Sequence, residues 1–238
     1  MDAVAAASGR GVEVRLGVRS AAALVGVALV VGGCSAAANS PSGNGTYRLL
    51  ATTSVFADLA RLAVGDAVLV ESIVPAGVDV HTFEPSPSDA ARIASANLIV
   101  ANGLGLDAWV GKLLDAAGTP RDTLLSLGVG LDASDGWTYL EAGSGAEKEA
   151  LGGVDPHIWL DPKGAALYVK KIAARVSADR PDLAARIDAE RDTGLSAIAA
   201  LDRELSASFA AIPVEHFRGH ISRDALAYIT KIILVMYI

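Results

Sequence analysis

The chain's 238 residues suffice for one large domain or two small ones, and a hydrophobic content of 52% with only 5% aromatic residues favours an aliphatic α/β core. Its net charge of −7, without a basic stripe or an aromatic platform, excludes the usual nucleic-acid-binding surfaces. The single cysteine excludes an internal disulfide, so packing has to hold the fold together.

Residues 1–33 are typical of a lipoprotein signal peptide. Three arginines precede an apolar run, residues 21–31, which is shorter than the roughly 20 residues that a membrane-spanning helix needs. Small residues then lead to Cys34, and this arrangement resembles the bacterial processing site at which the thiol is lipidated and becomes the new N-terminus. We therefore predict a protein outside the cytoplasm, anchored to the membrane through Cys34. The alternative is an ordinary secretory signal with an incidental cysteine.

Residues 34–46 have the composition of a flexible tether. They contain Ala, Asn, Ser, Pro and Gly and no charged residue. A linker of this kind has a typical end-to-end distance of about 20 Å, which would hold a domain near the membrane without packing against it. The folded part is expected to begin near Tyr47.

Strand and helix patterns alternate over residues 47–163. This alternation predicts an α/β lobe with a parallel sheet and covering helices. Ligands of such sheets bind beyond the carboxyl ends of the strands. The expected strands are Tyr47–Thr52, Val68–Val74, Leu98–Ala101 and Thr123–Leu127. One helix is expected after the caps Thr53 and Ser54, and two more are expected at Ser88–Ala96 and Leu106–Ala117.

Two of the four histidines lie in loops stiffened by proline. His157 lies between two prolines in DPHIWLDP, residues 155–162, and His81 lies in VHTFEPSP, residues 80–87. Proline fixes its own φ and restricts the preceding residue, so both loops should be ordered before any ligand binds. No Ser, Cys or second acid stands beside His157 to be activated, which favours a metal ligand over a general base. The alternative is a histidine buried in a turn.

Together these motifs resemble the substrate-binding proteins of ABC importers for zinc or manganese. The resemblance runs from about Tyr47 to about Pro213 and rests on VPAGVDVHTFEPSPSDAARIASANLIVANGLGLDAW followed by DPHIWLDP. It implies that His81 and His157 bind Zn²⁺, or alternatively Mn²⁺, as the transported ligand. It also implies a monomer that hands the metal to an ABC permease in the membrane.

Residues 164–213 are predicted to form a helical spacer. Apolar residues recur at helical spacing in Gly164–Asp179, and Pro181 marks the start of a second helix that continues to Ile212. A helix of about 30 residues is about 45 Å long. The resemblance implies that this long helix joins two α/β lobes that hold the metal between them.

Residues 214–238 depart from the pattern of that family. Arg223 stands where the family supplies a third ligand, and a guanidinium cannot ligate a cation. His220, three residues earlier, is the alternative third ligand. The family's second lobe with its carboxylate ligand is largely missing, so these residues are expected to be a remnant of that lobe in a truncated chain.

Three functions remain open from the sequence. The first is capture of Zn²⁺ or Mn²⁺ for an importer, and the second is a non-functional truncated fragment of such a protein. The third is a zinc-dependent hydrolase with Glu84 or Asp161 as base, which the lack of an H-E-x-x-H or comparable site disfavours, so no enzymatic activity is expected.

Two further segments have a structural interpretation. Residues 102–107, NGLGLD, lack the third glycine and the lysine of phosphate loops, which predicts a tight turn. Residues 132–154 are rich in Gly and acids and predict a surface excursion.

Overall fold

The computed structural model describes residues 46–139 and 153–210, and a four-stranded parallel sheet lies at the centre of this part. The sheet has the order β2-β1-β3-β4, so β1 is hydrogen-bonded to β2 and β3, and β3 to β4. The predicted α/β class with a parallel sheet is confirmed. The strands are β1 Arg48–Thr53, β2 Leu69–Val74, β3 Leu98–Ala101 and β4 Leu124–Ser126.

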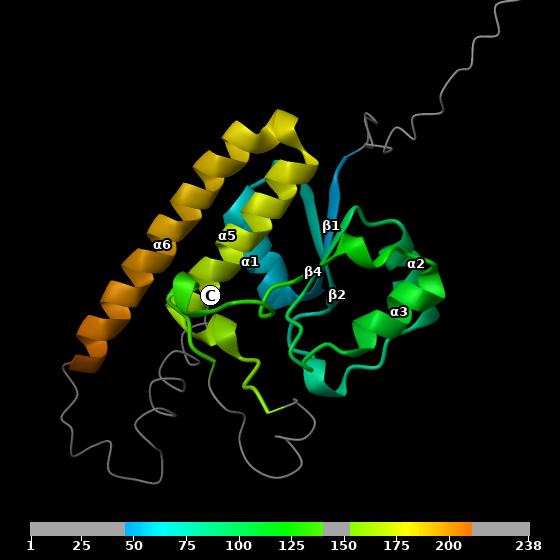
Figure 1. Cartoon of the computed structure of the whole chain (residues 1–238), viewed down its shortest axis with the longest axis horizontal. Helices are drawn as coiled ribbons and strands as arrows, with labels where there is room; N and C mark the ends of the chain where they lie inside the picture. The colour runs from blue at the N-terminus through cyan, green and yellow to red at the C-terminus, as the bar shows by residue number, and fades with distance from the viewer. Residues whose placement is uncertain (1–45, 140–152, 211–238) are drawn as a thin grey trace, which may run out of the picture. The chain divides into compact units, whose positions relative to one another are not determined.

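Helices cover both faces of the sheet (Figure 1). Helices α1, α5 and α6 lie on one face, and α2 and α3 lie on the other. Within the described residues, no helix is long and apolar enough to cross a membrane. The helices are α1 Ser54–Val64, α2 Pro87–Ala94, α3 Trp109–Ala117, α5 Pro162–Asp179 and α6 Ala184–Ala210.

Successive residues of the inner strands enter two different cores. In β1, Leu49 and Ala51 pack with α1, α5 and α6, whereas Leu50 packs with α2 and α3. In β3, Leu98 and Ile99 divide in the same way. Because both faces are buried, the central residues of these strands, Leu49–Ala51 in β1 and Leu98–Ala101 in β3, are continuously apolar, which made the strands recognisable from sequence.

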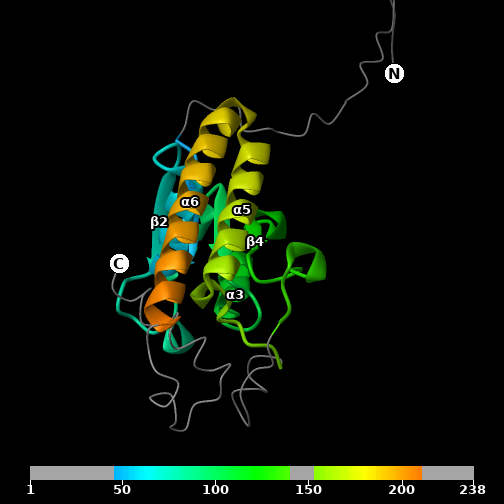
Figure 2. The same ribbon diagram turned by 90° about the vertical axis from the view of Figure 1, so that its left-hand side faces the viewer.

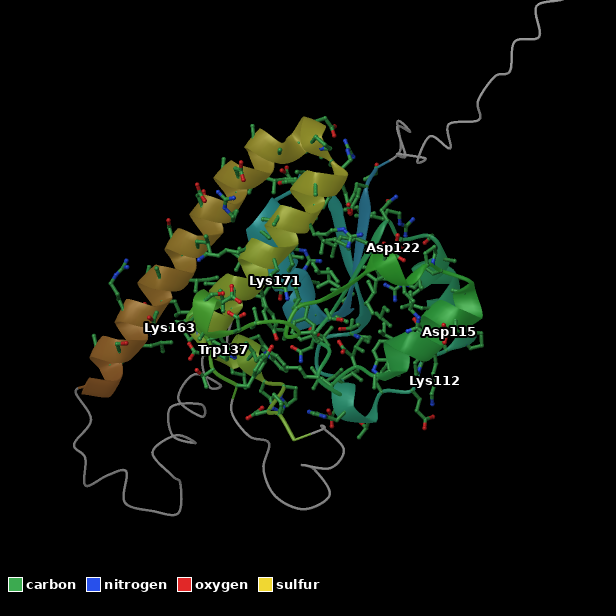
Figure 3. The ribbon with its side chains drawn as sticks, in the orientation of Figure 1. Lys112, Asp115, Asp122, Trp137, Lys163 and Lys171 are labelled. Carbon is green, nitrogen blue, oxygen red and sulfur yellow. The ribbon has the colours of Figure 1, made fainter. Side chains whose placement is uncertain are left out.

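Helix α5 packs in the hydrophobic core on one face of the sheet. Tyr168, Val169 and Ile172 are fully buried in the same cluster as β1 and α1. Lys171 on the same helix donates from Nζ to the carbonyls of Ser126, Leu127 and Val129 at 3.2, 2.9 and 2.7 Å, which ties α5 to the end of β4 (Figure 3). The first of the two spacer helices therefore completes the lobe.

Helix α6 turns back along α5 after a short connection at Pro181–Leu183 (Figure 2). A Cβ atom at Gly194 would lie 2.3 Å from the Leu62 carbonyl oxygen of α1, so these two helices touch backbone to backbone. With 27 residues, α6 is about 40 Å long.

Residues 132–139 are the described part of the segment that was expected to form a surface excursion. Residues 132–136 are exposed, as expected for such a segment. Trp137 (Figure 3), in contrast, is only 8% exposed, and the Tyr139 hydroxyl donates to the Gly128 carbonyl and accepts from the Leu131 amide. Two aromatic side chains therefore attach the end of this segment to the lobe. The signal peptide, Cys34, most of the tether and residues 214–238 lie outside the described residues.

Candidate metal centre

The two histidine loops meet at the edge of the sheet where the parallel strands end. His81 follows β2 in the 3-10 turn Val80–Thr82, and His157 directly precedes the 3-10 turn Ile158–Leu160 that leads into α5. Their Nε2 atoms lie 3.3 Å apart, although 76 positions separate them in sequence. The fold therefore brings together the two side chains that the sequence singled out.

The spacing of these nitrogen atoms suits a shared metal ion. Two nitrogen ligands at roughly 2.0–2.1 Å from one tetrahedral Zn²⁺ lie about 3.3–3.4 Å apart. In the absence of a metal, one Nε2–H can donate to the other Nε2 at the same distance, and both nitrogens have to be free of protons when they ligate.

His157 is oriented by Asp155. Oδ1 of Asp155 accepts a hydrogen bond from His157 Nδ1 at 2.7 Å and another from the His157 backbone N–H at 2.9 Å. With the proton held on Nδ1, Nε2 carries the lone pair that a metal needs. Burial opposes the ionisation of Asp155, but the bonds from His157 outweigh it and hold the pKa of this carboxyl below its ordinary value.

His81 is held more loosely. Asp79 Oδ1 accepts from the His81 backbone N–H at 2.9 Å, as Asp155 does for His157, but the described residues show no bond between this carboxylate and the imidazole. His81 is exposed, whereas the side chains of His157 and Asp155 are each 26% exposed. The two ligand candidates thus differ in how far the fold supports them.

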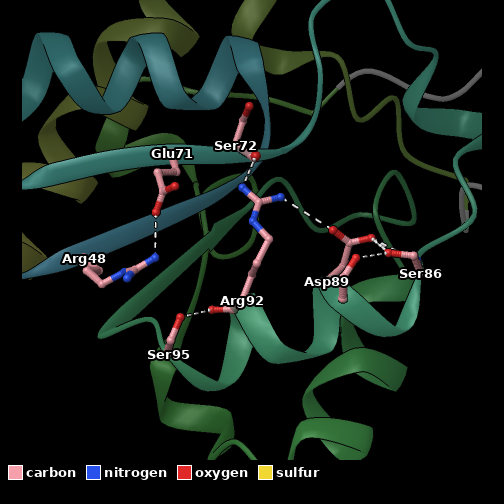
Figure 4. Close-up of polar contacts among 8 residues, drawn as sticks. Arg48, Glu71, Ser72, Ser86, Asp89, Arg92 and Ser95 are labelled. Atoms are coloured by element: carbon pink, nitrogen blue, oxygen red, sulfur yellow. Dashed lines mark hydrogen bonds and ion pairs between the residues drawn. The ribbon is translucent and has the colours of Figure 1, made fainter.

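The end of the His81 loop, where α2 begins, is connected to β2 through hydrogen bonds and an ion pair (Figure 4). Ser86, the N-cap of α2, donates from its backbone N–H and its hydroxyl to Asp89 Oδ2 at 2.9 and 2.7 Å. Arg92 approaches Asp89 at 3.5 Å and donates to the Ser72 carbonyl of β2 at 2.6 Å. Burial opposes the ionisation of Asp89, but the bonds from Ser86 and the charge of Arg92 prevail and lower its pKa.

A buried polar network, which the sequence did not reveal, lies beside the His157 loop. Asp107 is 1% exposed, and its carboxylate accepts from the backbone N–H groups of Asn102 and Gly103 at 2.7 and 2.9 Å and from the Thr52 hydroxyl at 2.7 Å. Burial raises the pKa of Asp107, and these bonds oppose the rise. In a phosphate loop, backbone N–H groups of this kind bind the phosphate of the ligand. In this turn the Asp107 carboxylate already occupies them.

Comparison with known proteins identifies the family. Residues 49–233 match the family described as ZnuA, zinc-uptake complex component A periplasmic. The chain belongs to this family. The family predicted from the two histidine motifs is thereby confirmed.

Two curated relatives of the chain are described as substrate-binding lipoproteins of metal ABC transporters, and one of these descriptions names manganese. The metal ABC transporter substrate-binding lipoprotein SsaB of Streptococcus sanguinis is 32% identical over 203 residues, which are 83% of this chain and 63% of SsaB. The manganese ABC transporter substrate-binding lipoprotein PsaA of Streptococcus pneumoniae is 32% identical over 213 residues, 86% of this chain and 66% of PsaA. The chain thus spans about two thirds or less of the length of these curated relatives.

A solved structure shows the same fold with a third metal. The crystal structure of Fe(III)-bound YtgA from Chlamydia trachomatis superposes with a TM-score of 0.60 at 28% identity, covering 71% of this chain and 55% of YtgA. The ZnuA-family fold is therefore common to proteins described with zinc, manganese or iron.

The described residues of this ZnuA-family chain provide two imidazoles and no larger donor cluster. Among residues 46–139 and 153–210, no group of three or more His, Cys, Asp or Glu side chains lies close enough to hold a metal ion. The alternative third ligand, His220, and the predicted ligand position, Arg223, lie outside these residues. Asp161, considered as a hydrolase base, caps α5 by accepting from the Lys163 N–H at 2.9 Å.

Proposed function

We propose that this chain captures Zn²⁺ outside the cytoplasm as the substrate-binding component of an ABC importer. His81 and His157 supply two nitrogen ligands through Nε2. The observation that carries the proposal is the 3.3 Å spacing of these atoms, which matches two ligands of one tetrahedral zinc ion. Family membership supports it, since the SsaB and PsaA relatives are substrate-binding lipoproteins of metal ABC transporters.

The ligand chemistry favours zinc over manganese. Neutral imidazole nitrogen suits Zn²⁺, whereas Mn²⁺ prefers carboxylate, carbonyl and water oxygens. Manganese remains the alternative cargo, because the PsaA relative is described as a manganese protein.

The unequal support of the two ligands suits a cargo site. His157 offers a lone pair that Asp155 has already oriented, so little ordering entropy is lost when the first bond forms. His81 closes on the ion from an exposed loop. The bond to His81 can therefore break without disturbing the core when the ion passes to the permease.

The proposed setting is a monomer tethered to the membrane by a lipid on Cys34, with the permease as its partner and no catalytic activity of its own. A Cys34→Ser variant tests the anchor, because no other residue of the chain can form the thioether. We expect this variant to be unprocessed or released from membranes. Its fractionation with membranes after cleavage at the same site would contradict the lipoprotein assignment.

Calorimetric titration of the full chain with Zn²⁺ and with Mn²⁺ tests the metal site. Since the described part supplies two ligands, we expect a dissociation constant for zinc that is micromolar or weaker, and weaker still for manganese. His81→Ala and His157→Ala should each reduce zinc affinity by at least about tenfold. His216→Ala is the matched control, and His220→Ala tests the alternative third ligand.

Three outcomes would contradict the proposal. Unchanged zinc affinity in both His81→Ala and His157→Ala would exclude them as ligands. Turnover of a hydrolase substrate panel without metal capture would favour the zinc-dependent hydrolase. A folded chain that binds neither metal would favour the non-functional fragment.

A further inference from the structure

We propose that Asn102 is a positioning residue of the candidate metal centre, holding the His157 loop in the arrangement that binds the ion. Asn102 lies at the carboxyl end of β3 and is completely buried. Its side-chain amide donates a hydrogen bond to the Pro156 carbonyl in the His157 loop, so it acts through Pro156 and not on the metal. The inference rests on the proposed function, since it assigns a role within that site.

Every hydrogen-bonding group of Asn102 has a partner. Nδ2 donates to the carbonyls of Pro156 and Gly103, both at 3.0 Å. Oδ1 accepts from the hydroxyl of Tyr168 at 2.6 Å, and the backbone N–H donates to Asp107. The backbone carbonyl accepts from the Gly128 N–H at 2.9 Å. A buried amide with all of these bonds made has one orientation, because the Pro156 carbonyl can only accept and Nδ2 has to face it.

The bond to the Pro156 carbonyl places one end of the peptide unit that leads into His157. The other end of that unit is the His157 N–H, which donates to Asp155. Asp155 also accepts from Nδ1 of the ring. Asn102 therefore fixes the peptide plane, Asp155 fixes the ring relative to that plane, and together they aim Nε2 at His81.

Tyr168 anchors this arrangement to the core. It is fully buried on α5, packs 6.1 Å from the ring of Phe56 on α1, and reaches Asn102 across 66 positions of sequence. The network thus connects the sheet, α5 and the His157 loop. A purely structural role would affect the stability of the fold, whereas a positioning role also has to affect His157 itself.

The test is made in the full chain and compares substitutions that disturb the bond to Pro156 with one that disturbs the same buried network elsewhere. Asn102→Ala removes the bond to Pro156. Tyr168→Phe removes a single hydroxyl and leaves the Asn102 amide in place with its orientation less restrained, which keeps the test open if Asn102→Ala does not fold. Thr52→Val is the matched control, because the Thr52 hydroxyl donates to Asp107 in the same buried network, whereas the bond to Pro156 comes from Asn102.

Three measurements are made on each variant: the free energy of unfolding in urea, the zinc dissociation constant by calorimetry, and the imidazole nitrogen and Nδ1–H resonances of His157 in metal-free protein. We expect Asn102→Ala to weaken zinc binding about 10- to 100-fold and to broaden or remove the Nδ1–H resonance. Tyr168→Phe should weaken binding about threefold with a shifted resonance. Thr52→Val should lose stability but keep both the affinity and the resonance.

Unchanged affinity and resonances in folded Asn102→Ala or Tyr168→Phe would overturn the positioning role. Equal losses in Thr52→Val would also overturn it, because the network would then act only on the fold. A wild-type chain without His81-dependent zinc binding would count against the proposed function instead. The resonances of metal-free protein would still decide whether Asn102 holds the His157 ring.

Discussion

The His81 loop and the His157 loop share a local arrangement and differ in what lies beneath them. Each has the order Asp-x-His, with the Asp Oδ1 accepting the His backbone N–H at 2.9 Å. In the His157 loop the same carboxylate also accepts from the ring, and Asn102 holds the preceding carbonyl. In the His81 loop the support lies at the exit, through Ser86 and α2.

This difference shows that a short motif determines a turn but not the direction of a side chain. The Asp-x-His turn needs only the carboxylate and the backbone that follows it. Orientation of an imidazole needs a second bond to the ring, and that bond depends on where the fold places the loop. The candidate site therefore combines one ligand built onto the core with one presented by an exposed loop.

The largest effect is expected from a substitution at Gly164, a residue of α5 that packs against the His157 loop. A Cβ atom at Gly164 would lie 2.1 Å from the carbonyl oxygen of Ile158, the residue after His157, so Gly164→Ala has to displace the loop or α5. We expect a loss of about 3 kcal/mol in the free energy of unfolding and weaker zinc binding. Urea denaturation and calorimetry measure the two quantities.

Gly77→Ala is the matched control in the His81 loop. Gly77 has a φ of +80°, and a Cβ atom there would meet nothing within 4 Å. The cost should be the strain of a left-handed alanine, about 1 kcal/mol, with zinc affinity nearly unchanged. Equal losses of affinity in the two variants would mean that both loops need the same rigidity.

The next largest effect on zinc affinity is expected from the two aspartates that precede the histidines, Asp155 and Asp79. Asp155→Ala and Asp79→Ala each remove one bond to a backbone N–H, but only Asp155→Ala also frees the ring of a proposed ligand. We expect zinc affinity to fall about 10- to 100-fold in Asp155→Ala and less than about threefold in Asp79→Ala, measured by calorimetry. A larger loss in Asp79→Ala would reverse the proposed asymmetry.

Most of the lobe was predictable because its signals are local. Leu98–Ala101 is a continuous apolar run and forms β3 with those bounds. Thr53 caps α1 by accepting from the Phe56 N–H at 3.3 Å, as its residue type suggested. Such features depend on a few neighbouring residues, so one sequence is enough to find them.

The candidate site was predictable only in its two imidazoles. Asn102 was assigned to a turn, because nothing in NGLGLD indicates that its side chain meets Pro156, 54 positions away, or Tyr168. One signal was available: Asn102 ends a buried strand at the same edge of the sheet as the histidine loops. That Asp155 and Asp79 both stand two residues before a histidine was a second signal.

A smaller effect concerns the exit of the His81 loop. Asp89→Ala removes the bonds to Ser86 and the ion pair with Arg92, and we expect a loss of about 1 kcal/mol of stability at neutral pH, as for a lost helix cap. Zinc affinity should fall less than about threefold, since His81 is already exposed. Asp58→Ala, which breaks an exposed pair with Arg61, should cost almost nothing.

The stability effect of Asp89 also has a predicted pH dependence. Its pKa in the folded protein lies below the ordinary value of 3.8, so the charged form stabilises the fold. This stabilisation is complete well above pH 3.8 and is lost as the pH falls below that value through the lowered pKa. Urea denaturation should therefore show wild type and Asp89→Ala converging in acid; a constant difference would assign the effect to side-chain packing.

The smallest expected effect on affinity belongs to the tryptophan beside each loop. Trp159 lies 5.3 Å from the ring of His157 and 5.1 Å from that of Phe56, while Trp109 lies 5.1 Å from Phe83 in the His81 loop. A divalent cation on His157 would be the largest local charge near Trp159 and should change its emission on binding.

Trp159→Phe should therefore lose the zinc-dependent change in fluorescence and keep the zinc affinity within about threefold. Trp109→Phe should keep both, because the ring that Trp109 packs against belongs to Phe83, which is not a proposed ligand. A zinc-dependent signal that disappears with Trp109 and persists without Trp159 would indicate that the ion binds away from His157.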